Sequence, residues 1–344
     1  MLDVSTVPRR ARRGLAAAAA VAVLLAATAS CSSGDDEADE AEGDSIAATP
    51  DGPFASGRRT MTLVDTSRPT DSVPNVLAAE PDRTIEVEVV YPAAGEPDPA
   101  PDPTGEPAAP GAAVADAPPA DGSFPLVVFA HGFNGDADFF VGFAERWARE
   151  GYVVALPTFP LSRRGIAILA DLANQPGDVS FVIDSLTSLA DHDPLAGHVD
   201  AEHIAVGGHS LGGATVFGVA YNSCCTDERI DATIPVSGGT LPFEGGDFDW
   251  PATPMLLVHG VADEIVPIAV GDAMFDATRG PVWYLRPAAA DHSGVFLHEP
   301  GRLFNEAAIA FLDAELKDDD AALQAMADEV TDSGIAEWRV APAG

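Results

Sequence analysis

The chain has 344 residues, of which 54 are acidic and 18 are basic, and its formal net charge is −36 at pH 7. A protein this negative repels phosphate groups, which argues against binding to nucleic acid or to anionic lipid headgroups. Hydrophobic residues make up 47% of the chain, which is enough for one large domain with a full core.

The first 30 residues have the pattern of an export signal. Four arginines precede an apolar stretch at residues 14–29, which is too short and too rich in alanine to span a membrane stably. Small residues then lead to Cys31, an order that resembles a bacterial lipoprotein signal in which this cysteine is lipidated. Cleavage after Ala29 with simple secretion is the alternative. We expect an exported protein that meets the outer face of the cell membrane only through this lipid anchor.

The remaining chain divides by composition. Residues 31–56 combine low hydrophobicity with high charge, which predicts a disordered acidic tether before a globular domain at residues 57–316. Residues 93–121 are dense in proline, alanine and acid, and they indicate a long solvated loop within that domain. Residues 317–344 are predicted to be a polar carboxyl-terminal extension, helix-prone to about Asp332.

Apolar runs typical of strands alternate with helix-like runs through the domain. The predicted strands are residues 60–65, 85–92, 126–130, 152–156, 204–206, 232–237, 255–259 and 282–286. Such alternation implies an α/β fold with a mostly parallel, eight-stranded sheet and helices on both of its faces.

The motif at residues 208–212 places a serine between glycines. An apolar run precedes it and a helix-like run follows it, so Ser210 is predicted to lie on a sharp strand-to-helix turn. A side chain at Gly208 or Gly212 would collide with neighbouring backbone in such a turn. Together with His209, these residues predict a nucleophile elbow that exposes the serine hydroxyl.

A serine nucleophile needs a general base, and the base needs a carboxylate that orients it. Asp263 follows the predicted strand at residues 255–259, and His292 lies in the loop after the next strand, at the same sheet edge. We therefore predict a triad in which His292 is the base of Ser210 and Asp263 orients it. His298 is the competing base, and the alternative for Asp263 is an ordinary solvated turn residue.

The oxyanion formed during acyl transfer needs N–H donors aimed at it in advance. The backbone of Leu211, directly after the nucleophile, is predicted to be one donor. The other is predicted to be the backbone of Phe133, in the flexible turn that follows the strand at residues 126–130. Three nearby phenylalanines either line an acyl pocket or belong to the core, namely Phe139, Phe140 and Phe143.

Taken together, these motifs resemble the α/β-hydrolase superfamily. Within it they are similar to the branch of dienelactone hydrolase-like proteins, chlorophyllases, platelet-activating-factor acetylhydrolases and cutinase-like polyester hydrolases. The residues that carry the resemblance are His131, Gly132, Phe133, residues 208–213, His259, Gly260, Asp263, Val266, Pro267 and His292. The resemblance covers about residues 57–315 and implies the α/β-hydrolase fold with hydrolysis of carboxylic esters.

Cys224 and Cys225 are adjacent in the chain. Neighbouring Cα atoms are about 3.8 Å apart, below the usual disulfide range of roughly 4.4–6.8 Å, so a bond between them would close a strained ring. An oxidising exterior permits such a vicinal disulfide, and two buried thiols are the equal alternative. No zinc-type spacing of cysteine and histidine occurs, so neither a metal nor a cofactor is predicted.

The sequence therefore predicts a serine hydrolase acting on a small-molecule or lipid-like ester of short-to-medium acyl length. A serine peptidase of the same fold, or a surface lipoprotein that binds a ligand without turnover, is the alternative.

Overall fold

A computed structural model of the protein describes residues 52–97 and 113–341. The predicted signal peptide, Cys31 and the predicted tether up to residue 51 lie outside the described residues, so export and lipidation stay predictions. In the described part of the chain, no helix is both long and apolar enough to cross a membrane.

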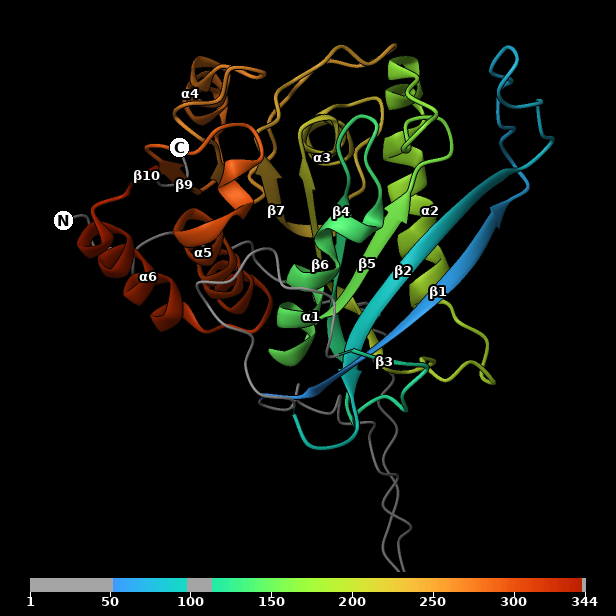
Figure 1. Ribbon diagram of the computed structural model, residues 1–344, viewed down its shortest axis with the longest axis horizontal. Helices are drawn as coiled ribbons and strands as arrows, with labels where there is room; N and C mark the ends of the chain where they lie inside the picture. The colour runs from blue at the N-terminus through green and yellow to red at the C-terminus, as the bar shows by residue number, and fades with distance from the viewer. Residues whose placement is uncertain (1–51, 98–112, 342–344) are drawn as a thin grey trace, which may run out of the picture.

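One large sheet forms the centre of the molecule (Figure 1). Its strands are β1 (Ala55–Asp65), β2 (Arg83–Ala93), β3 (Val114–Ala115), β4 (Phe124–Ala130), β5 (Val153–Thr158), β6 (Val199–His209), β7 (Ile230–Val236), β8 (Met255–Val258), β9 (Val282–Pro287) and β10 (Ala336–Ala341). Their order across the sheet is β10-β9-β8-β7-β6-β4-β5-β2-β1-β3. The strands from β9 to β5 in this order are parallel, while β2 and β10 join them antiparallel at either side. The predicted mostly parallel sheet is confirmed, but β3 and β10 bring the number of described strands to ten instead of eight.

Helices cover both faces of this sheet (Figure 1). In the described residues they are α1 (Val141–Arg149), α2 (Gln175–Thr187), α3 (Leu211–Tyr221), α4 (Ile268–Ala277), α5 (His298–Leu316) and α6 (Asp320–Ser333). Helices α1, α5 and α6 share one core cluster with the sheet, and α2, α3 and α4 contribute to the cluster on the opposite face. The predicted helix-covered sheet is therefore confirmed.

The central elements are buried because helices cover both faces of the sheet. All seven residues of β4 are buried, as is typical of a parallel strand that is covered on both faces. Every residue of α3 is buried as well. The helix that follows Ser210 is therefore packed inside the protein, against the sheet.

The fold begins earlier than predicted, and part of the predicted loop belongs to it. Phe54 packs edge-on against Phe124 with ring centroids 5.3 Å apart, so residues 52–56 are part of the domain and not of the tether. Within residues 93–121, β3 pairs with β1, and the Tyr91 hydroxyl donates to the Ala117 carbonyl at 2.7 Å. A strand of two residues has no periodicity from which it could be predicted.

The carboxyl-terminal segment also differs from the predicted polar extension. Helix α6 packs against α5, and β10 pairs with β9 over six residues. Leu323, Met326 and Val330 lie on the buried side of α6, at a spacing of three and four residues, while most of the helix surface is polar. This short apolar stripe was hidden by the polar composition of the segment.

A buried ion network anchors the chain that follows β5. The Arg83 guanidinium, fully buried at the start of β2, donates to Asp178 at 2.6 and 2.5 Å and to Asp171 at 2.9 Å. Burial alone would lower the pKa of Arg83, but the hydrogen bonds and attraction from these carboxylates outweigh it and raise that pKa. The network holds the 3₁₀ helix Leu169–Ala173 and α2 against β2, at the edge of the sheet where β5 ends.

Candidate active site

Ser210 lies in the tight turn between β6 and α3. Its backbone has φ 57° and ψ −115°, a conformation that costs a residue other than glycine about 1–3 kcal/mol. The surrounding backbone holds this turn, since the Ser210 N–H donates to the Val236 carbonyl at 2.9 Å and the Ser210 carbonyl accepts from the Ala214 N–H at 3.1 Å. Ser210 remains partly exposed between two buried neighbours, which presents its hydroxyl to solvent.

The glycines beside Ser210 are required by close backbone contacts, as the sequence predicts. A Cβ atom at Gly208 would lie 2.5 Å from the Gly212 carbonyl oxygen, and a Cβ at Gly212 would lie 2.2 Å from the Ala130 carbonyl oxygen. Any side chain at either position would force α3 away from β4.

Asp263 and His292 come together at the carboxyl ends of β8 and β9. His292 Nδ1 lies 2.8 Å from Asp263 Oδ2, and Asp263 Oδ1 accepts the backbone N–H groups of Ile265 and Val266 at 2.9 and 2.8 Å. The Asp263 side chain is fully buried, whereas the His292 side chain is 12% exposed. The competing His298 begins α5 and is exposed, and among the described residues it forms no hydrogen bond or ion pair with Asp263.

These hydrogen bonds set the charge of Asp263 and the tautomer of His292. Burial alone would raise the pKa of the Asp263 carboxyl, but the hydrogen bonds from His292, Val266 and Ile265 outweigh it and leave that pKa below its usual value. The carboxylate is therefore ionised at neutral pH, and Nδ1 must carry the proton that it donates to Asp263. This leaves Nε2 as the ring nitrogen that can accept a proton.

His209 ties the loop of His292 to the turn of Ser210. Its Nε2 donates to the His292 carbonyl at 2.9 Å, and the two ring centroids lie 4.7 Å apart. Burial, together with the neighbouring His292, lowers the pKa of His209 to about 4, so this ring is neutral. Within residues 113–341, no hydrogen bond joins the Ser210 hydroxyl to His292; such bonds are often loose in unliganded enzymes and tighten when substrate binds.

The turn after β4 lies directly against Ser210. A Cβ atom built on Gly132 would be 3.1 Å from Ser210 Cβ. Neither the Phe133 N–H nor the Leu211 N–H has an acceptor among the residues that the structure describes. Leu211 opens α3, where the first N–H groups of a helix have no partner within the helix. Both predicted donors are therefore near the serine with their N–H groups unpaired.

His131 fixes the shape of this turn. Its Nδ1 donates to the Gly132 carbonyl at 2.7 Å, and its Nε2 accepts from the Phe159 N–H at 3.1 Å. Burial lowers the pKa of His131, which keeps the ring neutral. The ring thus bridges the turn to the chain that leaves β5, and both of its nitrogens are used in doing so.

A buried polar chain that the sequence did not reveal connects the loop after β5 to α3. Gln175 Nε2 donates to Ser162 Oγ at 2.8 Å, and Thr215 Oγ1 donates to Gln175 Oε1 at 2.5 Å. The three side chains are far apart in the sequence and belong to no motif, so no local signal could have indicated them.

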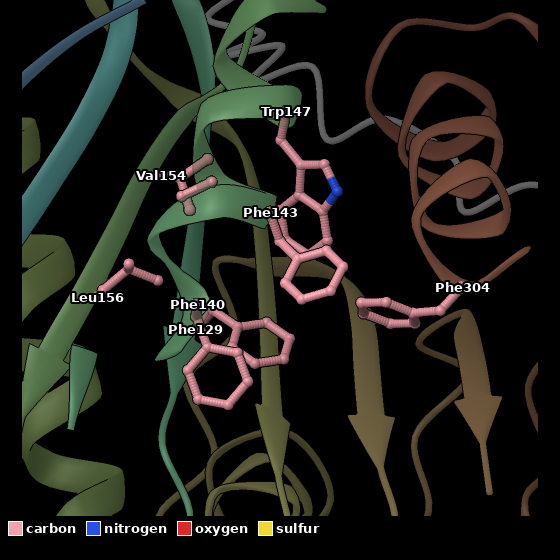
Figure 2. A pocket seen from close by; sticks show the side chains of 8 residues that line it. Phe129, Phe140, Phe143, Trp147, Val154, Leu156 and Phe304 are labelled. Carbon is pink, nitrogen blue, oxygen red and sulfur yellow. The ribbon is translucent and has the colours of Figure 1, made fainter. Parts of the chain in front are cut away.

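A small cavity lies inside the aromatic core between α1, α5 and the sheet (Figure 2). It is lined by Phe129, Phe140, Phe143, Ala144, Trp147, Val154, Leu156 and Phe304. Because no titratable side chain lines it, the cavity is a space in the core and not a reaction site. Phe140 and Phe143 are accordingly core residues, whereas Phe139 is 38% exposed.

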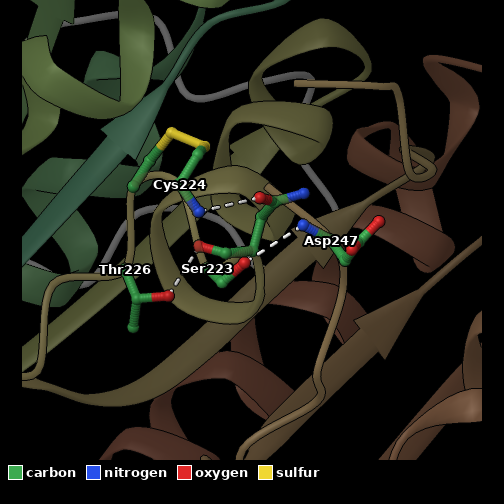
Figure 3. The surroundings of a disulfide bond; sticks show 6 residues. Ser223, Cys224, Thr226 and Asp247 are labelled. Carbon is green, nitrogen blue, oxygen red and sulfur yellow. Dashed lines mark hydrogen bonds between the residues drawn. A yellow bond between two sulfur atoms is a disulfide. The ribbon is translucent and has the colours of Figure 1, made fainter. Parts of the chain in front are cut away.

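Cys224 and Cys225 form a vicinal disulfide after the carboxyl end of α3 (Figure 3). Ser223 joins this segment to the loop after β7, because its N–H donates to the Asp247 carbonyl at 2.9 Å and its hydroxyl accepts from the Asp247 N–H at 3.1 Å. The two cysteines also pack against a cluster that contains Phe243. The hydrogen bonds of Ser223 and the packing of the two cysteines therefore hold the loop after β7 against the segment that follows α3.

Metal ligands do not gather in the described residues. There, no group of three or more histidine, cysteine, aspartate or glutamate side chains is arranged to hold a metal ion.

Comparisons with known proteins agree with this architecture. A family model described as Chlorophyllase matches residues 96–261. Solved structures in 859 chains also match, among them a ferulic acid esterase from Streptomyces cinnamoneus with 24% sequence identity and a TM-score of 0.59. That likeness covers 80% of this chain and 93% of the esterase chain. This structural likeness shows that the chain has the α/β-hydrolase fold. A comparison with the curated proteins found no match.

The predicted resemblance to the α/β-hydrolases is thereby confirmed. The family match contains Phe133 and Ser210 but ends at Val261, before Asp263 and His292. Roles for the last two residues therefore rest on their sequence positions and their geometry.

Proposed function

We propose that this protein, which has the α/β-hydrolase fold, is a serine hydrolase of carboxylic esters. The observation that carries the proposal is the 2.8 Å contact between His292 Nδ1 and Asp263 Oδ2, at the sheet edge where the turn of Ser210 exposes its hydroxyl. The name of the solved structural relative, a ferulic acid esterase, supports the same class of reaction.

In the proposed mechanism, Ser210 Oγ attacks the ester carbonyl while His292 Nε2 takes the hydroxyl proton. The N–H groups of Phe133 and Leu211 bind the negative oxygen of the tetrahedral intermediate. The intermediate then collapses, the bond to the alcohol breaks, and His292 returns the proton to the leaving alcohol. Water repeats these steps on the acyl-enzyme, which releases the acid and restores Ser210. Asp263 stabilises the protonated imidazole throughout.

Apolar side chains near this edge favour an ester with an apolar body. Six of the nine exposed large hydrophobic side chains in the described residues follow the carboxyl ends of β4, β5, β7 and β8. They are Phe133, Phe139, Leu169, Leu241, Val261 and Ile265. Since exposed apolar groups that gather in one region commonly mark a binding surface, we propose short-to-medium acyl or lipid-like esters as substrates.

The test is hydrolysis of 4-nitrophenyl esters from acetate to palmitate by the full chain and its Ser210→Ala variant. We expect the variant to lose at least about a thousandfold in kcat, because its nucleophile is gone. Ser293→Ala is the matched control, since this serine lies at the same edge and its hydroxyl has no hydrogen bond within the described residues. The chain-length profile measures the size of the acyl site.

Labelling by a fluorophosphonate probe separates the outcomes. A wild-type protein that neither turns over any ester nor labels at Ser210 would overturn the proposal and leave ligand binding without turnover. Labelling without ester hydrolysis, combined with cleavage of a peptide substrate, would overturn it in favour of a peptidase.

A further inference from the structure

Nearly every basic side chain in this acidic protein is neutralised by a neighbour. Arg58, Arg59, Arg68, Arg83, Arg164, Arg229, Arg286, Arg302, Lys317 and Arg339 each form an ion pair with at least one carboxylate. Within residues 52–97 and 113–341, only Arg163 and Arg279 form neither a hydrogen bond nor an ion pair through the side chain. With 54 acidic residues in the chain, a free guanidinium is an exception that needs a reason.

Arg163 is held beside the turn that carries the proposed oxyanion donor. Its backbone pairs with Gly135 in a parallel bridge, and the next residue, Arg164, donates its N–H to the Gly135 carbonyl at 2.9 Å. Gly135 closes a turn with Gly132 through a 3.0 Å hydrogen bond, and Gly132 lies against Ser210. A closed turn brings the Cα atoms of Gly132 and Gly135 within about 7 Å, and a bridge adds about 5 Å. An arginine side chain and a substrate can together span that range to Ser210.

The backbone that presents Arg163 is anchored on both sides. Ser162 accepts the hydrogen bond from Gln175 that leads to α3, and its carbonyl accepts from the Asn134 N–H at 2.8 Å. The Leu161 N–H donates to Asp171 Oδ2 at 3.3 Å, and Asp171 belongs to the buried network of Arg83. Arg163 itself is exposed, so its guanidinium projects from a fixed position into solvent.

The neighbouring charges leave this guanidinium unneutralised. Asp136 is the nearby carboxylate on the turn, and Arg164 pairs with it at 2.8 Å. Asp138, on the 3₁₀ helix Ala137–Phe140, is exposed and forms no ion pair with Arg163. One cation is therefore used to hold the turn, and the other remains free for a ligand.

We propose that Arg163 determines substrate specificity by binding a carboxylate on the ester, so that the preferred substrates are monoesters that carry a second, ionised acid group. This inference rests on the proposed ester hydrolysis. A planar guanidinium matches a carboxylate with two parallel hydrogen bonds, and these charge-assisted bonds are stronger than neutral ones. The net charge of −36 opposes the approach of such an anion, which gives a local cation at the site a clear role.

The experiment compares matched neutral and anionic esters on the full chain. On the acyl side, mono-4-nitrophenyl glutarate is compared with 4-nitrophenyl valerate; on the alcohol side, the butyrate ester of 4-hydroxybenzoate is compared with that of 4-hydroxybenzamide. We expect Arg163→Gln to lower kcat/KM for the anionic ester about tenfold in at least one pair, and to leave the neutral esters within about twofold. The pair that responds identifies which side of the ester faces Arg163.

Arg279→Gln is the control, because it removes an equally free charge far from the proposed site. Arg279 lies between α4 and β9, at the amino end of β9, whereas Ser210, Asp263 and His292 follow the carboxyl ends of their strands. An equal loss in both variants would mean that overall charge and not a local contact repels the anion, and would overturn the inference. An equal loss for neutral and anionic esters in Arg163→Gln would overturn it too, as a structural effect on the turn. Undiminished hydrolysis of neutral esters in these variants would leave the proposed esterase function standing.

Added salt gives a second readout. In the wild type, raising the salt from 0.01 to 1 M shortens the Debye length from about 30 to 3 Å and should reduce the contribution of Arg163 to hydrolysis of the anionic ester. The difference between wild type and Arg163→Gln should therefore shrink with salt, and a difference that salt does not change would contradict a charge contact.

Discussion

Asp178 and Asp263 are buried carboxylates at the same edge of the sheet, and they differ in the base that each of them contacts. Asp178 faces Arg83, which is fully buried and keeps its charge at any ordinary pH. Asp263 faces His292, whose imidazole is 12% exposed and keeps its Nε2 free to accept a proton. The buried pair of Arg83 and Asp178 holds two segments of the chain together. The pair of His292 and Asp263 can take part in a reaction, because the partly exposed imidazole can pass a proton through Nε2.

The strongest test of this difference is to neutralise the acid of the exchangeable pair. Asp263→Asn should lower kcat for ester hydrolysis about ten-thousandfold, because an amide no longer selects the His292 tautomer with its proton on Nδ1. The fold should persist, as judged by circular dichroism and thermal unfolding. Asp291→Asn is the control, since within the described residues the side chain of this neighbour of His292 accepts hydrogen bonds only from the N–H groups of Ser293 and Gly294. A similar loss in both variants would contradict the assignment.

Breaking the fixed pair should affect stability and not chemistry. Arg83→Met leaves Asp171 and Asp178 buried without their main partner, which should lower the free energy of unfolding by about 3–5 kcal/mol. Arg59→Met, which breaks a partly exposed pair with Asp193, should cost less than about 1 kcal/mol. Urea titrations measure both changes, and kcat per folded molecule should be retained. Equal costs for the two variants would show that burial does not set the strength of these pairs.

The third test concerns His209, a buried histidine that packs against His292. Its pKa of about 4 in the fold lies below its value of 6.5 in the unfolded chain. As pH falls from 6.5 to about 4, the unfolded chain therefore binds a proton that the fold does not, and stability should fall by up to about 3 kcal/mol. The lowered pKa of Asp263 adds to this loss only at still lower pH, below about 3.8.

His209→Phe should flatten this part of the stability profile, because phenylalanine keeps a ring against Phe296 and has no site for a proton. Urea unfolding at pH 7 and at pH 4.5 measures the slope. His192→Phe, at an exposed position, should keep the wild-type slope. An unchanged slope in His209→Phe would mean that another group titrates in this window.

Local chemistry explains which features could be predicted. The turn of Ser210 follows from steric limits on Gly208 and Gly212, which lie within five residues, so the motif alone specifies it. The positions of Asp263 and His292 follow from the rule that parallel strands end at one edge. The contacts of Arg83, Gln175 and the segment after residue 316 join parts that are distant in sequence, and each depends on packing that no short motif records.

The hydrogen bonds between β10 and β9 also decide where this protein can be shortened. They occupy the outer side of β9 from Val282 to Pro287, and Glu337 of β10 forms an ion pair with Arg286. A chain cut at residue 316 would leave β9 as a bare sheet edge, and unpaired strands of this kind recruit strands from other molecules. Such a truncated product should self-associate and precipitate during production, so its carboxyl end is best kept beyond residue 341.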